Sequence, residues 1–248
     1  MWSDSTCTDH RAYGACPHPR AALGLRSRHT GSRLQSGFTI IEVAITLVVV
    51  GLMFGSVLKA QEMITQAQIK NVIADLSGLA AAHSGYQYRY RALPGDDRNA
   101  GVRWAGPPAA SSGDGNGIVS GTYNNGGATC ANSVEACAWW SHLRHAGFVS
   151  GSGPAQPLNA FAGILGVQTG DGAGGPVMGG VFGLVLCSTN LPDKVAAAVD
   201  LQMDDGSPAS GSVRATLQLG ANPPLDNSVR GAYVEGGINL YLLCRAFA

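Results

Sequence analysis

The sequence contains little charge: Lys, Arg, Asp and Glu make up only 13% of its 248 residues, and their formal charges sum to zero. A chain this neutral lacks the basic surface that is typical of nucleic-acid-binding proteins, so we expect no nucleic-acid partner. It also lacks a Gly-x-Ser-x-Gly nucleophile motif and a Walker-type phosphate loop. Residues 170–175 (GDGAGG) match the Gly-x-Gly-x-x-Gly pattern, but a strand-like run, not a helix, follows them. We therefore expect no enzyme and no dinucleotide cofactor.

Cysteine is scarce, and no Cys-x-x-Cys pair occurs, which argues against a zinc site or a thioredoxin-like redox site. Two of the six cysteines precede residue 37, and the other four are Cys130, Cys137, Cys187 and Cys244. These four can form two disulfides if their part of the chain lies in an oxidising compartment, and four cysteines permit three pairings.

Proline is absent between Phe38 and Pro94, so nothing there interrupts a long helix. Residues 38–58 are almost wholly apolar and long enough to span a bilayer. In residues 59–92 apolar side chains recur at helical spacing, namely at Ile69, Val72, Ile73, Leu76, Leu79 and Ala80. We expect this amphipathic half to pack on a folded domain, and Gly78 and Gly85 to mark where the helix weakens or ends.

Residues 93–248 are expected to form the globular domain. A first stretch rich in Gly, Pro, Ser and Asn predicts loops and turns. A short helix is expected over Ser133–Ala146, capped by Asn132 or Ser133 and ended by Gly147. Strands are expected over 159–168, 177–188, 211–219 and 237–247, with another helix from Asn190 or Pro192 to about Met203. The predicted fold class is α+β, with the long N-terminal helix packed on a mainly antiparallel sheet.

Residues 1–37 hold five arginines and two aspartates, a local excess of three positive charges. Such a segment directly before an apolar run favours an N-terminus on the cytoplasmic side of a membrane. We interpret residues 1–37 as a leader; a shorter leader starting near Leu25 would still contain Arg26, Arg28 and Arg33, and the sequence does not decide between them.

Glu42 is the only charged residue between Phe38 and Leu58, and an acid inside a membrane helix is costly and usually functional. Cleavage between Gly37 and Phe38 would create an α-amino group at a similar depth. Between neighbouring copies packed with an axial stagger, this amine and the carboxylate of Glu42 can pair. Because an unpaired buried charge is penalised, Glu42 would then set the register of packing.

The run GFTIIEVAITLVVVGLM resembles the N-terminal segment of type IV prepilins and of the related pseudopilins of type II secretion. The resemblance implies cleavage after Gly37 by a prepilin peptidase, N-methylation of Phe38, and a role for Glu42 in assembly. It also implies that Gly51 is a position where the helix can loosen within a filament. It covers about 25 residues. The proline that many major pilins carry late in this helix is absent, and the leader is longer than most.

The implied function is that of a structural subunit of a type IV pilus or pilus-like filament. Its implied location is the bacterial inner membrane, as a single-pass protein with a cytoplasmic N-terminus, before assembly into a filament. The implied partners are other pilin subunits, the prepilin peptidase, an assembly platform with its ATPase, and membrane lipid. The alternatives are a pseudopilin of type II secretion, a minor or tip subunit that adheres or takes up DNA, and a membrane protein without a filament role.

The globular part is similar to pilin-like proteins with Pro-Gly-Asp and Gly-Asp-Gly-Asn-Gly loops, at ALPGDDRNAG and GDGNGIVSG. Pilins carry a disulfide near the C-terminus, and the resemblance implies that Cys187 pairs with Cys244 here. With that pairing, Cys130–Cys137 is the second disulfide that we expect. Pseudopilins often lack such a C-terminal disulfide, so these cysteines favour a pilus.

The loops also raise the question of a metal. Asp114 and Asn116 resemble part of a calcium loop, and Asp96 and Asp97 would complete a site if the two loops meet. The EF-hand spacing is missing, so we favour a plain Asp/Asn/Gly turn and expect no cofactor, with calcium as the one metal that these residues allow.

Three other pairs were weighed for chemistry. His142 and His145 can face one metal from a helix, but no third ligand is evident. We expect Asp204 and Asp205 to form a solvated turn, and Trp139 and Trp140 to pack in the core or an interface.

Overall fold

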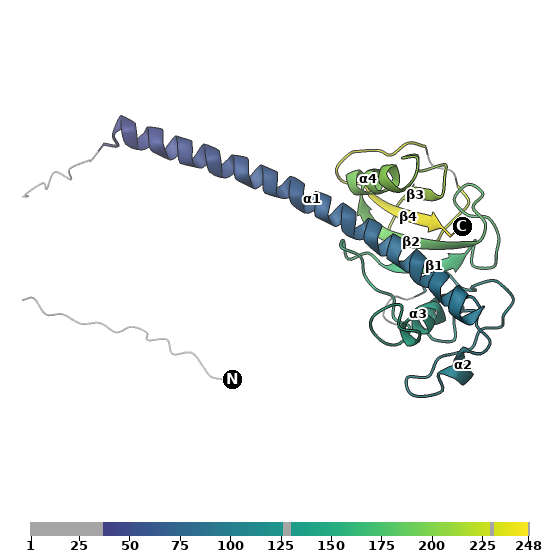
Figure 1. The fold of residues 1–248 in the computed structure, drawn as a ribbon. Helices are drawn as coiled ribbons and strands as arrows, with labels where there is room; N and C mark the ends of the chain where they lie inside the picture. Colours follow the sequence, from purple (N-terminus) through teal and green to yellow (C-terminus); the bar gives the residue numbers. More distant parts are fainter. Residues whose placement is uncertain (1–36, 126–129, 229–230, 248) are drawn as a thin grey trace, which may run out of the picture. The chain divides into compact units, whose positions relative to one another are not determined.

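A computed structural model describes residues 37–125, 130–228 and 231–247 (Figure 1). Its elements follow the order α1 (Ile40–Tyr90), α2 (Ala100–Arg103), α3 (Glu135–His145), β1 (Leu165–Thr169), β2 (Leu184–Pro192), α4 (Asp193–Met203), β3 (Val213–Leu217) and β4 (Leu240–Ala246). Contacts divide the chain into two compact units, one up to Val50 and one from Gly51 onward. The fold class is α+β, as expected from the sequence.

Helix α1 is continuous over 51 residues. Our expectation that Gly78 and Gly85 weaken or end it was wrong, because the helix passes through both. It ends instead where Arg91 adopts a left-handed backbone with φ 55°, while its N–H donates to the carbonyl of Gln87. Pro94 follows, three residues further on, and a proline beyond the C-terminus is typical of helix ends.

Burial on α1 begins at Ile69, ten residues after the start of the predicted amphipathic half. Met63 is still 65% exposed, whereas Leu76 is fully buried. The buried positions recur every three or four residues, at Ile69, Val72, Leu76, Leu79, Ala82, His83 and Tyr86. This spacing places them on one helix face, and that face packs into the main hydrophobic core.

The sheet has the strand order β1-β2-β4-β3, and every pairing is antiparallel. Successive side chains of β2 and β4 point to opposite faces of the sheet and pack in different hydrophobic clusters. Leu186 and Leu243 join α1, α3 and α4 in the main core, while Val185 and Leu242 join a second cluster with Tyr123 and Val177. Figure 1 shows the C-terminal half of α1 running across the sheet. Both faces of the sheet are therefore covered, one by helices and the other by loops.

Both edges of the sheet are also covered by the chain itself. On β1, the N–H groups of Leu165 and Thr169 donate to the carbonyls of Pro157 and Val119. On β3, the N–H of Val213 donates to Asp204 and that of Ala215 to the carbonyl of Pro208. An exposed edge is a template for pairing with another chain, so this cover restricts such pairing.

The predicted strands lie in the right regions, but their bounds differ. Residues 177–183 were expected to be strand and instead form turns with an isolated bridge between Val177 and Val181. Asn190, expected near a helix start, lies in β2 beside an irregularity in the pairing and has φ 59°.

The predicted caps of α3 were half right. The N-cap is Val134, without a side-chain hydrogen bond, so neither Asn132 nor Ser133 caps the helix. Gly147 does end it: its φ is 79°, its N–H donates to Arg144, and the N–H of Phe148 donates to Leu143. These are the two bonds of a Schellman motif.

Two disulfides join Cys130 to Cys137 and Cys187 to Cys244, the pairing that we expected. Cys187 and Cys244 face each other directly on β2 and β4, so this bridge ties the two central strands together. The sequence separations are 7 and 57 residues, and the longer loop constrains the unfolded chain more.

Candidate functional site

The start of α1 carries Glu42 in a capping box. The backbone N–H of Glu42 donates to Oγ1 of Thr39 at 3.3 Å, and the N–H of Thr39 donates to Oε2 of Glu42 at 3.4 Å. Each side chain thus satisfies a backbone donor that the helix leaves unpaired, and the carboxylate lies near the positive end of the helix dipole. The structure therefore gives Glu42 a local role that the sequence analysis did not foresee.

The apolar side chains that follow are exposed. Ile40 is 91% exposed, and large apolar residues stay exposed as far as Ile64. In the described part of the chain, α1 contains a window of mean hydropathy 2.4 with none of it buried, long and apolar enough to cross a membrane. The helix runs through Gly51 without a break. The predicted leader, apart from Gly37, lies outside the described residues.

The loop candidates for a metal come together only in part. Carboxylate oxygens of Asp96, Asp114 and Glu135 lie within 4.8 Å of one another. The side-chain amide of Asn116 donates to Asp114 at 2.9 Å, and its backbone N–H is shared between Asp114 at 3.0 Å and Asp96 at 3.2 Å. Asp97 binds Tyr86 and Arg103 instead, so the structure does not bring it to the other candidates, and Glu135 was not among the residues considered.

Backbone N–H groups already donate hydrogen bonds to the carboxylates of Asp96 and Glu135 in this acidic cluster. Asp96 accepts from the N–H groups of residues 115, 116 and 117, and Glu135 accepts from Asp114 and Ser120. Burial raises the pKa of Asp96, and the charge of Glu135 adds to the rise, while the N–H groups oppose it. These bonds make the loop a tightly bonded Asp/Asn/Gly turn, which is the structure that we favoured.

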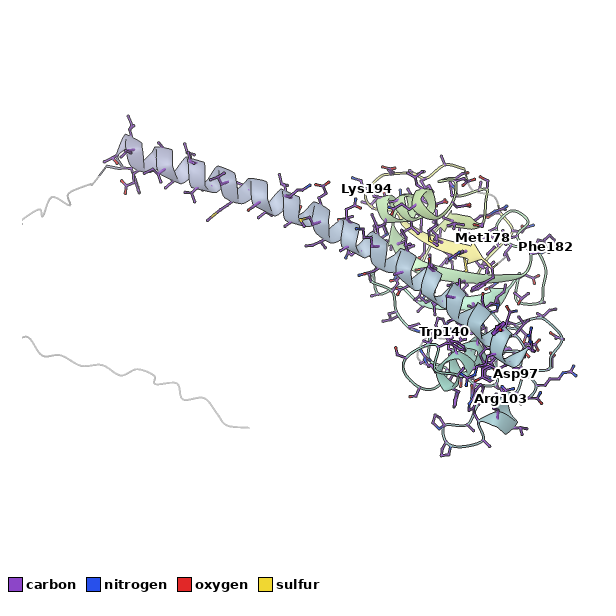
Figure 2. All side chains as sticks on the ribbon, viewed as in Figure 1. Asp97, Arg103, Trp140, Met178, Phe182 and Lys194 are labelled. Atoms are coloured by element: carbon purple, nitrogen blue, oxygen red, sulfur yellow. A yellow bond between two sulfur atoms is a disulfide. The ribbon has the colours of Figure 1, made fainter. Side chains whose placement is uncertain are left out.

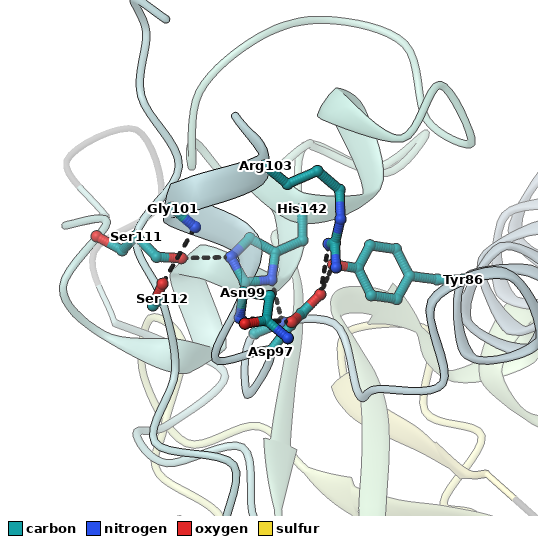
Figure 3. Close-up of polar contacts among 9 residues, drawn as sticks. Tyr86, Asp97, Asn99, Gly101, Arg103, Ser111, Ser112 and His142 are labelled. Atoms are coloured by element: carbon teal, nitrogen blue, oxygen red, sulfur yellow. Dashed lines mark hydrogen bonds and ion pairs between the residues drawn. The ribbon is translucent and has the colours of Figure 1, made fainter. Parts of the chain in front are cut away.

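Asp97 anchors the end of α1 (Figure 3). Its Oδ2 accepts from the hydroxyl of Tyr86 and from Nη1 of Arg103, both at 2.7 Å, and its Oδ1 accepts from the N–H of Asn99 at 2.8 Å. Burial acts to raise the pKa of Asp97, but these three bonds outweigh it and hold the pKa below its usual range. The network locks the loop after α1 onto the helix.

The two histidines of α3 are engaged by backbone groups. Nδ1 of His142 accepts from the N–H of Gly95 at 2.8 Å, and Nε2 lies 2.7 Å from the carbonyl of Ser111. Both ring nitrogens of His145 lie 2.7–2.8 Å from carbonyl oxygens, of Ser141 and Pro108. His142 is fully buried, and burial lowers its pKa. Neither residue is free to bind a metal in this arrangement.

The remaining pairs have structural roles as well. Asp204 accepts from the N–H groups of Ser212 and Val213, and Asp205 accepts from the N–H of Ser207 and the hydroxyl of Ser210, so both stabilise the turn before β3. Trp139 and Trp140 are fully buried in the main core, as expected.

No protein-family model, curated protein or solved structure matches this chain. The function has to be argued from the residues themselves. Among the described residues, the apolar segment with Glu42 is the feature that distinguishes this chain from an ordinary globular domain.

Proposed function

We propose that this protein is a prepilin whose mature form, beginning at Phe38, is a structural subunit of a type IV pilus or pilus-like filament. The observation that carries the proposal is the exposed apolar start of α1, with one acid at Glu42 directly after Gly37 and Phe38. The basic segment that precedes it supports insertion with a cytoplasmic N-terminus.

In this proposal the bilayer covers the apolar helix before assembly, and the helices of other copies cover it afterwards. Glu42 pairs with the α-amino group of Phe38 in a neighbouring copy, so only the correct axial position avoids an unpaired charge in apolar surroundings. The capping box holds the same carboxylate at the helix start.

The capping box makes a sharp test of the charge feasible. Glu42→Gln keeps a side chain that can complete the box but removes the charge, and Glu42→Ala removes both. Thr39→Ala removes the Oγ1 acceptor of the box, leaves the backbone N–H of residue 39 to donate to Glu42, and keeps the charge. In cells that produce the filament, we expect Glu42→Gln and Glu42→Ala to insert in the membrane and to fail in assembly, and Thr39→Ala to assemble.

Membrane fractionation checks insertion, and the yield of sheared filaments checks assembly. Normal filament yield from Glu42→Gln would show that capping, not charge, is the role of this residue. That result would remove the assembly function from Glu42.

A further inference from the structure

A groove of about 330 Å³ lies beside the C-terminal half of α1. One wall is α1 itself, with Asp75 and Gly78, and the other is formed by α3, β1 and the loops that join them, with Trp140, Phe148, Leu158 and Leu165. Figure 2 labels Trp140 next to α1. The groove is mainly apolar, and its rim is open, because Leu158 is 62% exposed and Phe148 37%.

Two polar groups of the groove have no partner among the described residues. The indole N–H of Trp140 is buried without a hydrogen-bond acceptor. Asp75 makes no hydrogen bond or ion pair with a described residue, although it is half-buried and burial raises its pKa. Buried polar groups are usually paired, so the unpaired indole N–H of Trp140 calls for an explanation, whereas the half-buried carboxylate of Asp75 is a charge that a partner can reach.

Gly78 keeps the groove open. A Cβ atom at this position would meet nothing within 4 Å, so the missing side chain leaves space rather than relieving a clash. Glycine is less favourable than alanine inside a helix. An open glycine on a helix wall next to an unpaired acid suits the close approach of another helix.

The same chain offers a helix face that complements this groove. Lys59, Glu62, Met63 and Gln66 share one side of α1, and both Lys59 and Met63 are well exposed. Among the described residues Lys59 pairs with Glu62 alone, one turn further on, and an exposed pair of this kind contributes little. This face therefore presents Lys59 beside Met63 and Ala67, with Glu62 and Gln66 on the same side, to a groove that presents an acid among mainly apolar walls.

We propose that the groove receives the Lys59 face of α1 from a second copy of this chain, with Lys59 of one copy paired to Asp75 of the other. This contact rests on the proposed filament function. Like the pair made by Glu42, it would fix the axial position of one copy against another. If the two helices are parallel, the copies are displaced by 16 residues, or about 24 Å along the helix axis. The apolar side chains of the incoming helix then cover Phe148 and Leu158.

Zero-length cross-linking with a carbodiimide tests the contact directly on wild-type filaments. The reagent joins a lysine amine to a carboxylate that already lies against it. Lys59 and Asp75 of one α1 are about 24 Å apart, so any Lys59–Asp75 linkage must join two copies. We expect mass spectrometry to find this linked peptide, and to find none with Asp75→Asn.

Reversing the charges of Lys59 and Asp75 tests how much their contact contributes to assembly. We expect Lys59→Glu and Asp75→Lys each to lower filament yield about fivefold or more, and the double exchange to restore most of it. Gly78→Leu fills the groove without changing charge and should lower the yield as well. Lys194→Glu, an exposed lysine on α4, and Glu235→Lys are the matched controls and should assemble normally. Thermal unfolding of each variant confirms that it folds.

The outcomes separate this contact from the proposed function. Filaments that form normally in both single exchanges, without the Lys59–Asp75 peptide, overturn the contact and leave the filament function standing. A wild-type protein that is not cleaved after Gly37 and forms no filaments overturns both.

Discussion

The two halves of α1 differ in environment far more than in helical character. From Ile40 to Ile64 its large apolar side chains are exposed, and from Ile69 to Tyr86 a stripe of side chains is buried in the core. The second half needs one apolar face because it meets one domain surface. Up to Leu58 the first half is apolar on nearly all sides, with Glu42 as its one charged residue, which suits surroundings that are apolar on all sides, such as lipid or other helices. A single apolar face therefore marks the part of α1 that packs on the globular domain. Apolar side chains on nearly all faces mark the part that we propose packs in the membrane and in the filament.

The largest difference in stability should come from truncating one leucine to alanine in each half. Leu76→Ala removes a fully buried side chain and should lower the free energy of unfolding by about 3 to 5 kcal/mol. Leu47→Ala removes a side chain that is exposed and should leave the unfolding of the globular unit unchanged. Denaturant unfolding of the full chain in detergent, followed by the fluorescence of the buried tryptophans, measures both. Equal losses in the two variants would break the distinction between the halves.

A smaller effect should come from the anchor at the end of the buried half. Asp97→Asn turns one acceptor into a donor that faces the donors of Tyr86 and Arg103, which should cost about 2 to 3 kcal/mol. Arg103→Lys is the matched control, since it keeps a charge opposite Asp97 and should cost less.

The pH dependence of the same anchor has a definite sign. The pKa of Asp97 is below its usual 3.8 in the folded protein, so its stabilisation is present above that value and is lost as the pH falls through the folded pKa. For Asp96 the pKa is raised, so its contribution is greatest below 3.8 and declines as the pH rises through the folded pKa. Unfolding at several pH values should show the acid-side loss weakened in Asp97→Asn. An unchanged acid-side slope would contradict this assignment.

The smallest effect compares two glycines of the buried half. Gly78→Ala meets open space and should stabilise the helix by about 0.5 to 1 kcal/mol. In Gly85→Ala the new Cβ would lie 2.8 Å from the ring of Phe148, so the ring must shift and offset that gain. Thermal unfolding of the two variants side by side should rank Gly78→Ala as the more stable. The reverse order would show that the open space beside Gly78 is filled in solution.

Sequence periodicity predicted the long helix, its buried face and the four regions of strand well, because these depend on spacing along the chain. The ends of elements were less predictable. Val134 is the N-cap of α3 although two better capping residues precede it, and Glu135, the first residue of the helix, accepts from the backbone N–H groups of Asp114 and Ser120. Tertiary contacts of this kind leave no local signal in the sequence.

The acidic cluster of Asp96, Asp114 and Glu135 likewise depends on tertiary contacts that the sequence did not predict. Asp96 and Asp97 are neighbours in sequence, yet one accepts from the GDGNG loop and the other from Tyr86 and Arg103. Residue type made Asp96 and Asp114 candidates for one site on the condition that the two loops meet, but it gave no sign that Glu135 of α3 would join them. The capping role of Glu42, by contrast, was readable from Thr39 three residues earlier.

The central claim is that the apolar half of α1 becomes the N-terminus of the mature protein. Mass spectrometry of the N-terminal peptide of the protein isolated from its membrane or filament tests this directly. The account predicts a peptide that begins at Phe38 and carries a methyl group on its α-amino nitrogen. A mature protein that retains residues 1–37, or one cut after the apolar run, would contradict it.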